Sequence, residues 1–160
     1  MTTKVNDVRA VLVRGAKAEA IADGSPAIEA EHVLLALTEL TGTTTARLLA
    51  EAGLTRETFR AALDSEWEQS LSVAGVTVTV AELPKATPDR SRNPQIGETT
   101  KLLLKRATAT SAGGRIGAAH LLIGALNTNL GRIPRALDLA GINREALQAQ
   151  AVEAAARGDH

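Results

Sequence analysis

The chain has 160 residues, no cysteine and equal numbers of acidic and basic side chains, 18 of each. The lack of cysteine excludes disulfides and thiolate zinc sites, and the balanced charge removes the global field that would draw a protein to nucleic acid or to an anionic membrane. Phe59 and Trp67 are the only aromatic side chains, so stacking on bases or sugars is not expected as a binding mode.

Hydropathy along the chain argues against a membrane protein. No stretch reaches the roughly 18 consecutive apolar residues that a membrane-spanning helix requires, and residues 1–7 lack the apolar run of a signal peptide. We therefore expect a cytoplasmic protein without a membrane partner.

Apolar spacing and stop signals predict four helices in the first part of the chain. They are expected after a cap at Asn6, over His32 to Leu40, over about Thr45 to Ala52, and after a cap at Thr55. Gly53 is expected to end the third helix with a positive φ, because a residue without a Cβ takes the left-handed conformation most readily.

A linker is predicted next, over residues 69–98. Within it, residues 75–80 alternate between valine and a small or polar residue, which is typical of a half-buried strand. We interpret this segment as an ordered extended linker. The alternative is an unpaired strand that is available to pair with something else.

The second part of the chain predicts four further helices. They are expected over about Thr99 to Ala112, over His120 to Leu126, around Pro134, and after a cap at Asn143. Gly141 lies where Gly53 lies in the first part, and we expect the same positive φ there.

The two parts are copies of one unit. Residues 28–35 reappear as residues 116–123, and residues 52–57 reappear as 140–145, both at a spacing of 88. The first helices of the two copies match better at a spacing of 91. The sequence therefore predicts an all-α fold of two tandem four-helix repeats related by pseudo-twofold symmetry, with eight helices in one compact domain: repeat 1 over 1–68, the linker over 69–98 and repeat 2 over 99–157.

The motif Ile-x-x-Glu-His before a Leu-rich helix, followed by a Gly-terminated helix and a capped one, resembles the repeat of the Clp N-terminal domain. In that family the domain lies at the entrance of a hexameric AAA+ unfoldase. The resemblance implies a non-catalytic module that binds substrates, adaptors or degradation tags, or that regulates Clp proteolysis. The linker is longer than is usual for the family, and we expect a free-standing protein without ATPase modules.

Motifs for catalysis and for cofactor or metal binding are missing from the sequence. The chain contains no Gly-x-x-x-x-Gly-Lys-Ser/Thr phosphate loop and no Gly-x-Ser-x-Gly nucleophile motif. His32 and His120 have no second ligand at metal-binding spacing. We interpret both as structural histidines whose ring nitrogens bond the backbone near a helix start. No enzyme activity, cofactor or metal is expected.

Phosphoarginine is one ligand that the resemblance suggests. In phosphoarginine-reading members, the Glu before the motif His binds the guanidinium, and groups at a helix start hold the phosphate. This implies a site formed by Glu31 with Asn6 and Asp7, and no second site, because Ala119 replaces the Glu in the second copy. The alternative is that Glu31 only stabilises the helix start through its charge.

Cyclic peptide antibiotics are a second ligand that the resemblance suggests. Members of the family bind cyclic peptide antibiotics through Phe side chains at the starts of the two first helices, and free-standing relatives sequester them. This chain has Thr2 and Val5 at one position and no aromatic residue over 93–98, so such a decoy would depend on aliphatic contacts.

A DNA-binding alternative rests on residues 133–147, whose pattern resembles a helix-turn-helix. Its recognition helix would hold Arg144 but also Glu145 and Glu153, and it is too poor in positive charge for phosphate contacts. No nucleic acid partner is expected.

Overall fold

The computed structural model describes residues 8–84, 88–89, 91–129 and 131–158, and helices dominate this part of the chain. The helices are α1 (Val8–Ala10), η2 (Val11–Ala16), α2 (Lys17–Ala22), α3 (Ala30–Thr38), α4 (Thr44–Glu51), α5 (Arg56–Val73), α6 (Glu98–Ser111), α7 (Ala118–Leu126), α8 (Arg132–Leu139) and α9 (Arg144–Ala156). The π-helical η2 joins α1 and α2 into one continuous first helix. Counted in this way, the described chain has eight helices and a short 3₁₀ turn, η3 (Val80–Glu82), so the predicted all-α fold is confirmed.

The duplication is visible in the helix bounds. α3 and α7 begin and end 88 residues apart, and so do α4 and α8, while α5 and α9 begin 88 residues apart. The first helices of the two copies correspond at a spacing of 91. At this spacing the buried Leu12 and Ala16 match the buried Leu103 and Ala107. The copies therefore differ in length between their first and second helices.

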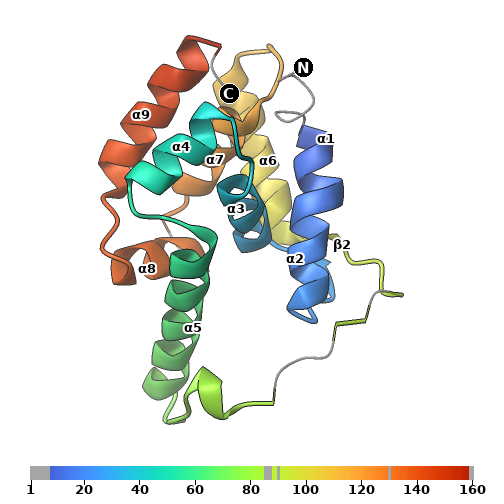
Figure 1. The fold of residues 1–160 in the computed structure, drawn as a ribbon, viewed down its shortest axis with the longest axis vertical. Helices are drawn as coiled ribbons and strands as arrows, with labels where there is room; N and C mark the ends of the chain where they lie inside the picture. Colours follow the sequence, from blue (N-terminus) through green and yellow to red (C-terminus); the bar gives the residue numbers. More distant parts are fainter. Residues whose placement is uncertain (1–7, 85–87, 90, 130, 159–160) are drawn as a thin grey trace.

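The core lies around α3 and α7, which pack against each other near the centre of the molecule (Figure 1). All nine residues of α7 are buried, as are residues 30–37 of α3. A helix that is apolar around its whole circumference belongs inside the protein. The fourth helix of each copy packs on the third helix of the other, α5 on α8 and α9 on α4, so the two copies share one core.

A two-residue parallel ladder, which the sequence did not predict, joins the copies. β1 (Ala27–Ile28) pairs with β2 (Gln95–Ile96) in the register Ala27 with Gln95 and Ile28 with Ile96. The Gly97 N–H extends the ladder by donating to the Ile28 carbonyl at 2.9 Å. This ladder places the start of α3 beside the start of α6.

The linker differs from its prediction. α5 continues to Val73, so the first five residues of the segment predicted as a linker over 69–98 are helical. Residues 75–80 form no paired strand. Residues 76–79 are irregular and largely exposed, and at the end of the segment the Val80 N–H donates to the Glu68 carboxylate of α5 at 2.6 Å. Figure 1 shows that α5 reaches past the other helices, with the linker turning back at its end.

The helix-terminating signals appear where they are expected. Gly53 has a φ of 88° and Gly141 a φ of 73°, and the side chains of Thr55 and Asn143 accept the N–H groups of Thr58 and Ala146 as N-caps. Among the described residues, no helix has the length and apolar character needed to span a membrane.

Candidate functional site

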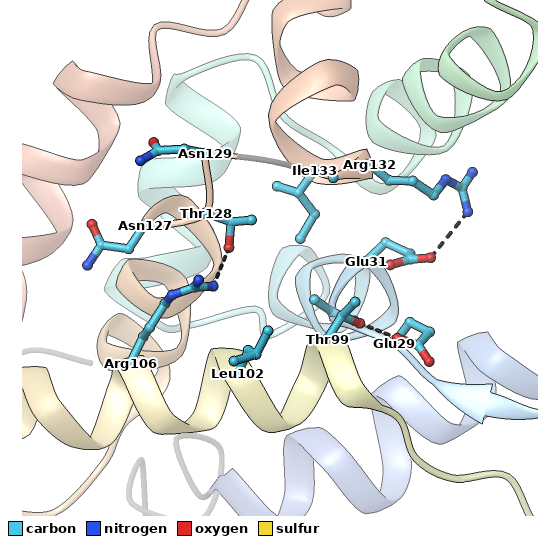
Figure 2. A pocket seen from close by; sticks show the side chains of 12 residues that line it. Glu29, Glu31, Thr99, Leu102, Arg106, Asn127, Thr128, Asn129, Arg132 and Ile133 are labelled. Carbon is cyan, nitrogen blue, oxygen red and sulfur yellow. Dashed lines mark hydrogen bonds and ion pairs between the residues drawn. The ribbon is translucent and has the colours of Figure 1, made fainter. Parts of the chain in front are cut away.

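A groove of about 590 Å³ lies between the two copies (Figure 2). It is bounded by the starts of α3 and α8, by one face of α6 and by the loop after α7. Its lining residues are Glu29, Ala30, Glu31, Thr99, Leu102, Arg106, Asn127, Thr128, Asn129, Gly131, Arg132 and Ile133. Because the lining comes from both copies, the groove depends on their packing.

Threonines of α6 hold the start of α3 against the groove. The Thr99 hydroxyl accepts the Ala30 N–H at 2.8 Å and donates to the Glu29 carboxylate. The Thr100 hydroxyl donates to the Ile28 carbonyl at 2.7 Å. Polar groups at the start of α3, which lack partners within that helix, are thus bonded by the other copy.

Glu31 lines the groove but is already paired with a cation. Its carboxylate lies 3.2 Å from Nη1 of Arg132, at the start of α8. Nε of Arg132 donates to Glu66 at 3.0 Å, and Nη2 donates to the Leu63 carbonyl at 3.3 Å. Arg132 therefore connects α3, α5 and α8 at one point.

Glu66 is the most deeply buried carboxylate of this network, with 3% of its side chain exposed. It accepts hydrogen bonds from Arg132, from Arg135 at 2.9 Å and from the Ser70 hydroxyl at 2.8 Å. Burial alone raises the pKa of Glu66, but the bonds from Ser70, Arg135 and Arg132 outweigh it and lower the pKa below its usual value.

The two motif histidines hold helix starts. Nδ1 of His32 accepts the Glu29 N–H at 2.9 Å, and Nδ1 of His120 accepts the Gly117 N–H at 3.0 Å. Nε2 of His32 also lies 2.9 Å from the Asp23 carboxylate. Burial raises the pKa of Asp23, but the bond to His32 and the charge of Arg60 lower it overall. Within the described ranges, no cluster of three or more His, Asp or Glu side chains is arranged for a metal ion.

The two ends of the groove differ in charge. Glu29 and Glu31 lie at one end together with Arg132, which is paired with Glu31, whereas Arg106, Asn127, Thr128 and Asn129 lie at the other (Figure 2). Leu102 lies between them, and 48% of it is exposed. The lining is therefore acidic at one end, apolar in the middle, and basic and polar at the other end.

The sequence had singled out only part of this groove. Of the predicted ligand residues, Glu31 lines it, whereas Asn6 and Asp7 lie outside the described residues. Arg106 and Leu102 were missed, although their spacing of four on one predicted helix indicates a shared face. Arg132 was also missed. Its partners Glu66 and Glu31 lie 66 and 101 positions earlier in the chain, and no local sequence pattern links residues so far apart.

Fold and site together define a helical domain built by duplication, with a groove where its copies meet. The family model described as "Clp repeat (R) N-terminal domain" matches residues 2–113, and the chain belongs to this family. Among solved structures, the chain is similar to the crystal structure of the N-terminal domain of the caseinolytic protease associated chaperone ClpD from Arabidopsis thaliana. The two share 21% identity with a TM-score of 0.63, over 94% of this chain and 96% of the other. At this identity the likeness is one of fold. A sequence comparison with curated proteins gives no match.

Proposed function

We propose that the chain is a non-catalytic, cytoplasmic module that binds unfolded polypeptide segments in the groove between its copies. The observation on which this proposal depends is that Leu102 is nearly half exposed in a groove whose other lining side chains are mostly polar or charged. Concave sites with an apolar floor and a few polar groups are typical ligand sites. Membership of a family whose domains bind substrates and adaptors supports the same function.

Two narrower ligands are outside this proposal. Phosphoarginine would have to displace Arg132, whose guanidinium already lies beside Glu31. For cyclic peptide antibiotics, the Phe positions of the family correspond to Thr2 and Val5, which lie outside the described residues, and to residues 93–98, which do not line the groove. Extended peptide with aliphatic side chains fits this lining better.

Leu102→Asp tests the proposal. Fluorescence anisotropy with labelled, reduced and carboxymethylated lactalbumin, a permanently unfolded polypeptide, should show affinity at least tenfold lower for the variant. The reason is that a carboxylate at position 102 must lose its water when an apolar segment docks there. Leu139→Asp is the matched control, since Leu139 is 41% exposed and lies outside the groove. Equal affinity of wild type and Leu102→Asp would contradict the proposed site, and absence of any binding would contradict the proposed function.

A further inference from the structure

Charge and spacing along α6 give the groove a direction. Thr99, Leu102 and Arg106 all line it, and they are three and four residues apart, as neighbours on one helical face are. Figure 2 shows these side chains in that order along α6. Since Thr99 donates to Glu29, the carboxylate of Glu29 marks the Thr99 end of the row.

Arg106 has room for an anion. Nη1 of Arg106 donates to the neutral Thr128 hydroxyl at 2.9 Å, and within the described chain no carboxylate forms an ion pair with it. Asn127 and Asn129 lie at the same end. A guanidinium that is bonded to a neutral hydroxyl within the described chain suits a carboxylate, which accepts several hydrogen bonds at once.

Glu29 offers the opposite charge at the other end. Its carboxylate is bonded by the neutral Thr99 hydroxyl, whereas the neighbouring Glu31 is paired with Arg132. Glu29 is half-buried and lines the groove. It is therefore the carboxylate at this end that can accept a cationic side chain of a ligand.

The helix sets the distance between the two charges. Arg106 lies seven positions after Thr99, which corresponds to about 10 Å along a helix with a rise of about 1.5 Å per residue. An extended peptide advances by about 3.4 Å per residue, so about three of its residues span the same length. Leu102 lies between the ends, where a ligand's apolar side chain would contact it.

We propose that the groove reads an extended peptide in one direction, with a carboxylate at Arg106, an apolar side chain on Leu102 and a Lys or Arg, three residues before the carboxylate, at Glu29. This inference rests on the proposed function, because it names the peptide class that the same groove binds. The carboxylate can come from the end of a chain or from an acidic side chain.

Labelled octapeptides test the inference by fluorescence anisotropy. The first ends in Lys-Ala-Leu-Ala with a free carboxylate, and the second is its amide. The third is an amide that ends in Lys-Ala-Leu-Ala-Asp, in which the Asp side chain lies on the same face of the extended peptide as Lys and Leu. Wild type should bind the free acid roughly tenfold more tightly than the plain amide, the loss expected for one charge-assisted contact. If the Asp amide binds as tightly as the free acid, any carboxylate suffices; if it does not, the chain end is read.

Variants assign each charge to its residue. Arg106→Gln should abolish the difference between acid and amide, whereas Lys105→Gln, which removes an exposed cation beside it on α6, should preserve that difference. Glu29→Gln should abolish the preference for Lys over norleucine in the peptide. Circular dichroism of each variant confirms that it folds.

The inference and the proposed function can fail separately. If the acid and the amide bind wild type equally while the unfolded reporter still depends on Leu102, the direction of reading is overturned and the proposed function stands. A difference between acid and amide that persists in Arg106→Gln also overturns the inference. If neither the reporter nor any peptide binds, both fail.

Discussion

Glu66 shows how one side chain can hold the two copies together. It projects from α5 to Arg132 and Arg135 of α8, and only 3% of it is exposed. At the spacing of 88, its equivalent in the other copy is Ala154, which is buried without a charge. The α5–α8 interface therefore contains an ionic cluster, whereas Ala154 gives the α9–α4 side no such carboxylate.

The first prediction at the residue scale concerns Glu66→Gln. Losing the charge weakens the hydrogen bonds from both arginines, and we expect the free energy of unfolding to fall by about 2 to 3 kcal/mol at neutral pH, the upper part of the range for hydrogen bonds to charged groups. Because the folded-state pKa of Glu66 is lowered, its contribution is fully present above the unfolded pKa and is lost as pH falls through the folded pKa.

Urea unfolding followed by circular dichroism from neutral to acidic pH checks this. The variant should lose less stability on acidification than wild type. Glu153→Gln, on an exposed position of α9, should follow wild type. Parallel pH profiles of wild type and Glu66→Gln would contradict the assignment of the lowered pKa to Glu66.

At the scale of elements, glycines determine how helices end and how closely they cross. A Cβ on Gly15 would lie 2.7 Å from the Cβ of Ala36, and a Cβ on Gly124 would lie 2.5 Å from the Leu103 carbonyl. Both copies thus need a glycine where the first and second helices cross. The first copy has it on the first helix and the second copy on the second helix.

The helix ends at Gly53 and Gly141 yield the second prediction. A Cβ at either position would meet no atom within 4 Å, so a substitution should cost backbone strain alone. Gly53→Val and Gly141→Val should each lower the free energy of unfolding by roughly 1 to 2 kcal/mol, and by similar amounts. Ala140→Val is the control, since Ala140 is exposed and already has a φ of −77°. Strongly unequal losses at the two glycines would show that the two helix ends are not equivalent.

Local signals accounted for most of the elements but not for their extensions. The glycine stop at Gly53 and the cap at Asn143 depend only on neighbouring residues, so they can be predicted from sequence. The spacing of 88 then predicts the equivalent helix ends in the other copy. No local signal predicts that α5 continues to Val73, because its last turns are exposed and lack the apolar stripe that marks a helix. A two-residue ladder is too short to show alternation.

The groove was harder to predict than the helices. Its polarity depends on Glu29 and Arg106, which lie 77 residues apart and share the groove only through the packing of the two copies. Glu31 was singled out by a family motif, but no motif indicated that Arg132 pairs with it. Tertiary contacts of this kind leave no periodic pattern in one sequence.

At the scale of the whole molecule, the exchange of helix contacts between copies predicts cooperative unfolding. α5 packs on α8, α9 packs on α4, and α3 packs on α7, so the buried residues of the two copies form one continuous core. We expect one transition, with the same midpoint for Trp67 fluorescence, which reports on α5 and its surroundings, and for circular dichroism, which reports on all helices.

Leu137→Ala extends this test to the other copy. Leu137 is fully buried in α8, and its truncation should lower the free energy of unfolding by about 2 to 5 kcal/mol. The Trp67 midpoint should shift as far as the midpoint seen by circular dichroism. A Trp67 midpoint that does not move would show that the copies unfold independently.

The hydrogen bonds that Thr99 and Thr100 make to the start of α3 also affect the entropy of binding. They fix the floor of the groove across the junction of the copies, and moving the copies apart would leave the Ala30 N–H and the Ile28 carbonyl without these partners. The groove is thus preorganised before a ligand arrives. The conformational entropy lost on binding is then mainly that of the peptide. A peptide already constrained to an extended shape should therefore bind more tightly without any new contact.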